Sequence, residues 1–140
     1  MNLELYATPK EVMRAVEALR EFGRDNRLQE KVLFALELTL EECGSNIVNH
    51  SLRSKPGLTF HVSVQLTGNA VVIELRDRGP EFDPTKSPAI QRKVDLENQP
   101  PGGWGLVLVR RYMDEVQYVR QNGQNILTLT KRLAGTEGWT

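Results

Sequence analysis

The strongest constraint on the fold is a change in the spacing of apolar residues near residue 57. Before it, between about Gln29 and His50, apolar residues recur at helical spacing and form one stripe. The residues of this stripe are Val32, Leu33, Leu36, Leu40, Cys43 and Ile47. After it, Leu58 to Leu66 alternates apolar with polar residues, as a half-buried strand does. This change predicts that a helical part is followed by antiparallel hairpins.

The residues before the change predict a strand and two helices. Leu3 to Ala7 alternates apolar and polar residues and is expected to form a short first strand. Thr8-Pro9-Lys10-Glu11 has the pattern of a capping box with proline at the first helical position. The helix that it begins is expected to end near Gly23, and the second helix runs from about Gln29 to about His50.

The residues after the change predict two hairpins around a long loop and a short helix. Gly68-Asn69 is a turn between Leu58–Leu66 and a strand over Val71–Leu75. The segment from Asp77 to Gly105 has no period and holds most of the prolines, and a loop of this length is usually functional or disordered. The expected later elements are a helix over Leu106–Met113 and strands over Val116–Val119 and Ile126–Thr130, joined at Asn122-Gly123.

Hairpins separated from helices predict an α+β fold, a two-layer α/β sandwich. Its sheet is expected to be mixed but mostly antiparallel and covered by helices on one face. The chain of 140 residues fits one domain, expected over residues 1–133, with a tail at residues 134–140.

Charge and cysteine content narrow the class of protein. Lys and Arg together number 18, as do Asp and Glu, and this balance argues against direct nucleic-acid binding. No apolar run is long enough to span a membrane, and the first residues lack the features of a signal peptide. The single cysteine, Cys43, indicates a reducing compartment and is expected to be a core residue. We therefore expect a cytoplasmic protein.

Three short stretches carry residues that could take part in catalysis or ligand binding. In the first, Glu42 and Asn46 lie four residues apart, so they share one helix face, and Asn49 extends it by a turn. A carboxylate and an amide on one face can activate a hydroxyl and hold a metal ion. The alternative is an ordinary solvated helix face.

The second and third stretches flank the long loop. Asp77 follows a strand and can accept a hydrogen bond from an amine, while Gly79 lets a flat ring approach the backbone. Gly102, Gly103 and Gly105 precede a helix, where free backbone N–H groups favour phosphate. The alternatives are a plain turn for the second stretch and a hinge for the third. The third lacks the Gly-Lys-Ser/Thr of a phosphate-binding P-loop.

The combination resembles the GHKL superfamily of ATPases, which have the Bergerat fold. Glu-x-x-x-Asn on a helix, Asp-x-Gly-x-x-Phe-Asp after a strand, and Gly-Gly-x-Gly-Leu opening a helix resemble its N-box and two glycine boxes. Within it, the runs 42–50 and 105–116 resemble the bacterial anti-sigma factor serine/threonine kinases. The resemblance implies binding of ATP and Mg²⁺ and transfer of phosphate to a serine of an anti-sigma antagonist.

The resemblance also implies roles for the residues of the first two stretches. Glu42 corresponds to the general base that accepts the serine proton, and Asn46 to the ligand of Mg²⁺. Asn49 is expected to help hold the phosphates. Asp77 would accept from the adenine amino group, and Gly79 would leave room for the ring.

The same resemblance extends to the loop and the last hairpin. Gly102, Gly103, Gly105 and Leu106 would cradle phosphates at the start of the helix. The segment Thr85 to Pro101 would be a lid that closes over the nucleotide. In the last hairpin, Asn125 stands near a position where relatives often have threonine, and would keep a hydrogen bond near adenine.

The expected function has two alternatives. The leading hypothesis is a serine kinase that binds a sigma factor and works as a homodimer, pairing near the first strand, Leu3 to Ala7. One alternative is a non-catalytic protein-binding module gated by nucleotide, favoured by Gln99-Pro100-Pro101, where several relatives carry a basic residue. Arg92 or Lys93 is a candidate substitute for that cation. The other alternative is a switch kinase of the same family that binds no sigma factor.

Overall fold

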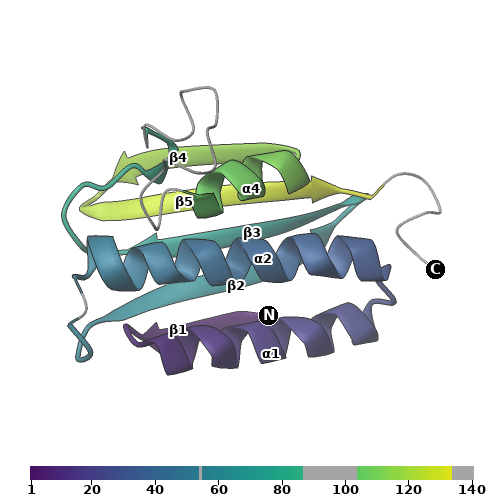
Figure 1. The fold of residues 1–140 in the computed structure, drawn as a ribbon, viewed down its shortest axis with the longest axis horizontal. Coiled ribbons are helices and arrows are strands. Elements are labelled where there is room, and N and C mark those ends of the chain that lie inside the picture. Colours follow the sequence, from purple (N-terminus) through teal and green to yellow (C-terminus); the bar gives the residue numbers. More distant parts are fainter. Residues whose placement is uncertain (54, 87–103, 134–140) are drawn as a thin grey trace.

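The computed structural model describes residues 1–53, 55–86 and 104–133, and its element order matches the prediction (Figure 1). The elements are β1 (Asn2–Tyr6), α1 (Pro9–Asp25), α2 (Glu30–Asn46), η1 (Ile47–Ser51), β2 (Thr59–Thr67), β3 (Ala70–Asp77), η2 (Pro84–Lys86), α4 (Trp104–Tyr112), β4 (Glu115–Gln121) and β5 (Gln124–Arg132). Most of the expected lid, Thr85 to Pro101, and the tail at 134–140 lie outside the described residues.

The five strands form one sheet in the order β1-β2-β3-β5-β4. Each of the four strand pairings in the described part of the chain is antiparallel. The expected mostly antiparallel sheet is therefore confirmed, and among the described strands it contains no parallel pair. The turn at Asn122-Gly123 places both residues at positive φ, 54° and 74°, which suits the twist of a two-residue hairpin. β1 lies at one edge of the sheet, as predicted, and β4 lies at the other.

The helices α1, α2 and α4 lie on one face of the sheet, which confirms the two-layer α+β prediction (Figure 1). Thr8 caps α1 by accepting the Glu11 N–H at 3.2 Å, as the capping pattern predicts. The apolar stripe of α2 is buried except for Leu33, which is partly buried beside Gly23 of α1. Gly44 lets Val12 of α1 approach closely. None of the described helices is long and apolar enough to span a membrane.

The C-terminal end of α2 continues as one turn of π-helix, η1, before the chain enters β2. Its i to i+5 pattern is closed by the Leu52 N–H, which donates to the Ile47 carbonyl at 2.8 Å. The second helix was predicted to end near His50, and the wider turn carries it to Ser51. The side chain of Ser51 is buried in the structure. Such single π-turns often occur at functional sites.

Candidate functional site

The strand register assembles one wall of a pocket beneath the helices. Asp77 at the end of β3 lies opposite Asn125 of β5, and Leu75 lies opposite Leu127. Leu127 is in turn opposite Tyr118 of β4. Because residues two apart on a strand share a face, these five side chains all point from the sheet toward the helices.

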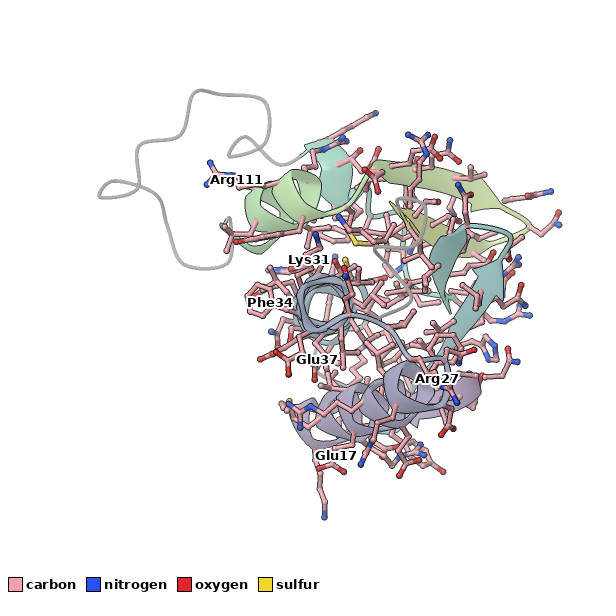
Figure 2. All side chains as sticks on the ribbon, turned by 90° about the vertical axis from the view of Figure 1, so that its right-hand side faces the viewer. Glu17, Arg27, Lys31, Phe34, Glu37 and Arg111 are labelled. Atoms are coloured by element: carbon pink, nitrogen blue, oxygen red, sulfur yellow. The ribbon has the colours of Figure 1, made fainter. Side chains whose placement is uncertain are left out.

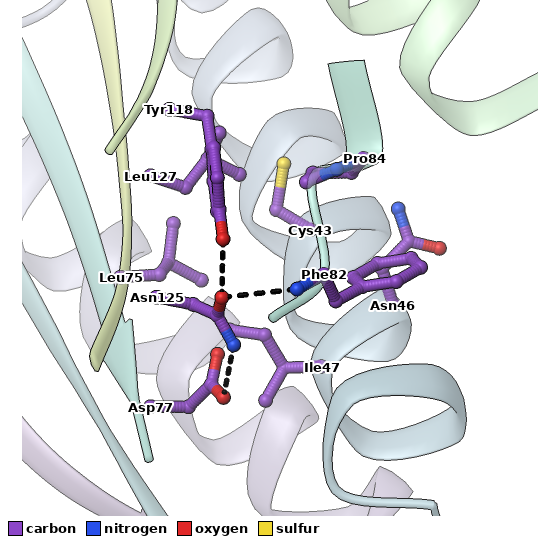
Figure 3. Close-up of a pocket in the computed structure, with 10 residues that line it drawn as sticks. All are labelled: Cys43, Asn46, Ile47, Leu75, Asp77, Phe82, Pro84, Tyr118, Asn125 and Leu127. Carbon is purple, nitrogen blue, oxygen red and sulfur yellow. Dashed lines mark hydrogen bonds between the residues drawn. The ribbon is translucent and has the colours of Figure 1, made fainter. Parts of the chain in front are cut away.

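This pocket is a small hollow that is partly open to solvent (Figure 3). The other side is formed by α2, η1 and the segment after β3. The residues that line the pocket are Cys43, Asn46, Ile47, Leu75, Asp77, Phe82, Pro84, Tyr118, Asn125 and Leu127. The lining is therefore mostly apolar with a few polar groups, as expected for a small-molecule site.

Asp77 is the centre of a buried hydrogen-bond network. Its Oδ1 accepts from the Gly79 N–H at 2.9 Å, from Asn125 Nδ2 at 3.0 Å and from the Ser51 hydroxyl. Within the described part of the chain, no donor reaches the second oxygen, Oδ2. A buried carboxylate held by three donors is fixed in orientation, and Oδ2 keeps its capacity to accept a further bond.

Asn125 joins the sheet to the segment after β3 (Figure 3). Its Nδ2 donates to the Pro80 carbonyl at 2.8 Å, and its Oδ1 accepts from the Phe82 N–H at 3.1 Å and from the Tyr118 hydroxyl. Burial raises the pKa of the Tyr118 phenol above its ordinary value, so the hydroxyl keeps its proton. The amide therefore holds the backbone at 80–82 against the pocket.

Gly79 has no space for a side chain. A Cβ at this position would lie 2.5 Å from the Ser51 carbonyl oxygen and 2.6 Å from its hydroxyl. The φ angle of Gly79 is not in the left-handed region, so the requirement for glycine comes from close approach alone. The Arg120 guanidinium also donates to the Gly79 carbonyl at 2.7 Å, which holds the turn from the other side.

The α2 side of the pocket carries Asn46, and Glu42 lies one helical turn before it. Partial burial raises the pKa of the Glu42 carboxyl, and repulsion from Glu41 raises it further. A raised pKa makes a carboxylate a better proton acceptor. Cys43 follows Glu42 along α2 and lines the pocket, and its complete burial raises the pKa of the thiol to about 12. Cys43 is therefore a core residue that also lines the pocket, not a nucleophile.

The lining of the pocket has the chemistry that the base of ATP requires. Apolar walls from Ile47, Phe82 and Leu127 can contact a flat ring, and Oδ2 of Asp77 is an acceptor for an exocyclic amine. No group of three His, Cys, Asp or Glu side chains that could hold a metal ion occurs in the described residues. Mg²⁺ would therefore need oxygen ligands from Asn46 and from phosphates, the arrangement usual for this ion.

The remaining predicted site residues lie in several places. Asn49 is exposed on η1, and Gly105 lies in the first turn of α4. Leu106 is buried in the hydrophobic core, so packing alone accounts for it. Gly102 and Gly103 lie outside the described residues.

The sequence interpretation missed Ser51 and Tyr118, and it gave no role to Phe82. Ser51 donates to Asp77 across 26 residues of chain, and Tyr118 reaches Asn125 from the neighbouring strand. No local pattern marks either residue. The alternation of the last hairpin, which puts Tyr118 on the same face as Leu127, was the one available signal.

Comparisons with known proteins identify the family of this chain. Residues 5–131 match the family described as histidine kinase-like ATPase domain. The chain is 33% identical over 135 residues to the serine/threonine-protein kinase BtrW of Bordetella bronchiseptica, covering 95% of this chain and 94% of that protein. It is 26% identical over 105 residues to the anti-sigma F factor of Anoxybacillus flavithermus, covering 72% of this chain and 70% of that protein.

A solved structure shares the fold. The RsbU and RsbW domains of Rv1364c from Mycobacterium tuberculosis align with a TM-score of 0.63 at 19% identity. The alignment covers all of this chain and 34% of that one, so this chain spans about a third of the longer protein. The family match and the 33% identity to a full-length relative carry the assignment. This chain belongs to the histidine kinase-like ATPase domain family.

Proposed function

We propose that this chain is an ATP-dependent serine protein kinase that acts as an anti-sigma regulatory factor. The observation that carries the proposal is the placement of Asn46 and Asp77 in one pocket, with Glu42 a single helical turn away. The relative that shares 33% of its residues over nearly its whole length is a serine/threonine-protein kinase, which supports the same activity.

The proposed roles follow the chemistry of each side chain. Asp77 accepts a hydrogen bond from the adenine amine through Oδ2. Gly79 leaves room for the ring, and its N–H holds Oδ1 of Asp77 at 2.9 Å. Asn46 supplies its amide oxygen to Mg²⁺, while Asn49 and the glycines 102, 103 and 105 contact the phosphates. ATP supplies the phosphoryl group that is transferred.

Glu42 is the group that we assign to proton transfer. A serine hydroxyl is a weak nucleophile until a base accepts its proton, and a half-buried carboxylate with a raised pKa is suited to this step. Its neighbour Glu41 is exposed on the same helix and is not assigned to proton transfer. The pair therefore offers a matched comparison.

The proposed partners are a sigma factor and an anti-sigma antagonist protein that carries the substrate serine, and the proposed location is the cytoplasm. The anti-sigma F factor among the relatives supports the sigma-factor partner. The chain is further proposed to form a homodimer along the β1 edge, where Tyr6 and Leu58 are 57% and 44% exposed. Light scattering at micromolar concentration tests the dimer, and a monomer mass with and without ATP would contradict it.

Phosphosite mapping tests the kinase activity. The wild-type chain is incubated with Mg²⁺-ATP and native lysate, and the phosphorylated serines of captured proteins are identified. Transfer to the mapped serine should fall by ~10²–10⁴ in Glu42→Gln with ATP binding retained, because an amide keeps the shape but accepts no proton. Glu41→Gln is the matched control and should keep transfer. Equal rates in all three proteins would remove Glu42 as the base, and a chain that binds ATP but transfers no phosphate would instead be a nucleotide-gated binding module.

A further inference from the structure

Two aromatic side chains contact each other on the outer face of the helical layer. Phe34 of α2 is 54% exposed, and Tyr112 at the end of α4 is 37% exposed. Their rings meet edge to face, with centroids 5.6 Å apart and planes at 82°. A single exposed apolar residue is ordinary, but a pair held in contact between two helices is a preformed apolar surface. We call Phe34 and Tyr112 the aromatic pair.

The rim of the aromatic pair is basic on the α4 side. Figure 2 shows Lys31 and Arg111 on that side of Phe34, with Glu37 on the α1 side. Glu37 is already paired with Arg20. The ammonium of Lys131 donates to the Tyr112 carbonyl at 2.8 Å and adds positive charge at the same helix end. Glu30 lies one turn before Phe34 on α2. Among the described residues it forms no ion pair, and it is the nearest such carboxylate along this helix.

The solvent-facing side of α2 extends from Phe34 to the part of the helix that carries Glu42. Leu38, Glu41 and Ser45 follow at helical spacing on the solvent side of the same helix. Glu42 lies eight residues after Phe34, which is about 12 Å along the axis and about 80° around it. The surface is therefore basic and aromatic at one end and acidic at the other, where Glu41 and Glu42 stand.

We propose that the aromatic pair is the docking site for the protein substrate of this chain. It takes an apolar side chain flanked by carboxylates, with the apolar group against Phe34 and Tyr112 and the carboxylates opposite Lys31 and Arg111. The step after docking, in which a serine of the bound segment reaches Glu42, rests on the proposed kinase function. An extended segment covers about 12 Å in about four residues, so a serine about four residues from the docked side chain can reach Glu42. Acidic residues beside that serine are disfavoured by Glu41.

A random peptide library displayed on phage tests the docking surface without any kinase chemistry. Selection on the wild-type chain should enrich peptides that carry an apolar residue next to Asp or Glu. Phe34→Ala with Tyr112→Ala should lose this enrichment, and Lys31→Glu with Arg111→Glu should shift it away from acidic peptides. Met13→Ala is the matched control, because Met13 is also exposed, at 42%, but lies on α1. No enrichment, basic consensus sequences, or equal enrichment on the Phe34 and Tyr112 variant would overturn the proposal.

A kinetic measurement then connects docking with transfer. A synthetic peptide with the enriched sequence and a serine about four residues from its apolar residue is offered with Mg²⁺-ATP. Phe34→Ala should raise KM for the peptide about tenfold or more and leave kcat and ATP affinity nearly unchanged. An unchanged KM would overturn the docking role. A wild-type chain that binds no ATP would instead contradict the proposed function. The phage selection would still show whether the aromatic pair binds peptides.

Discussion

Gly79→Ala tests whether the pocket depends on close approach of the chain at this turn. The added Cβ would lie 2.5 Å from the Ser51 carbonyl oxygen, about 1 Å inside ordinary contact. Ser51 is buried and its carbonyl belongs to the backbone, so this oxygen cannot rotate away from the added Cβ. Overpacking of this kind costs ~1–3 kcal/mol, while alanine in place of glycine regains ~0.4–1 kcal/mol through the unfolded state. We expect a net loss of roughly 1–2 kcal/mol in the free energy of unfolding.

Gly57→Ala is the matched control, because nothing lies within 4 Å of a Cβ at Gly57 and its φ is not left-handed. This variant should be neutral or slightly more stable in urea denaturation. The Gly79 variant should also bind ATP about tenfold or more weakly, since the shift moves the Gly79 N–H away from Asp77. Two variants of equal stability and equal ATP affinity would refute the packing argument.

Three further predictions concern the titratable groups. Asp77→Asn should weaken ATP binding by about 1.5–3 kcal/mol in calorimetry, because an amide cannot replace a charged acceptor in this network, and unchanged affinity would contradict its role. Transfer should rise with pH through a pKa above the ordinary glutamate value of 4.5, since Glu42 acts deprotonated, and Glu41→Gln should move that rise to lower pH by removing repulsion. The Cys43 thiol should resist a disulfide reagent at neutral pH until the chain is unfolded, and fast labelling of the native protein would contradict its burial.

The architecture was predictable because hydrophobic period and turn residues act locally. The change from helical to alternating spacing predicted the helices and both hairpins, and Thr8 and Asn122-Gly123 marked real boundaries. The second helix was predicted to end near His50 and its last turn ends at Ser51, but the change from α-helix to π-helix after Asn46 was not predicted.

The site was predictable only where its motifs are local. Asn46 and Asp77 were expected from short patterns, and the structure brings them to one pocket. The bonds from Ser51 and Tyr118 depend on strand register and on contacts between distant residues, which no short pattern contains. Leu106 is buried in the core, so its side chain packs inside the protein, and its expected part in holding phosphates stays a prediction. The contact between Phe34 and Tyr112 depends on how α2 meets α4.

Isothermal titration of the wild-type chain with Mg²⁺-ATP, alongside Asp77→Asn, tests the central claim most directly. The claim is that the pocket around Asp77 and Asn125 binds ATP. We predict saturable heat with one site per chain, weakened when EDTA removes the metal and much reduced in the variant. An absence of heat and of any thermal shift at millimolar ATP, in a protein that is folded by circular dichroism, would contradict the account.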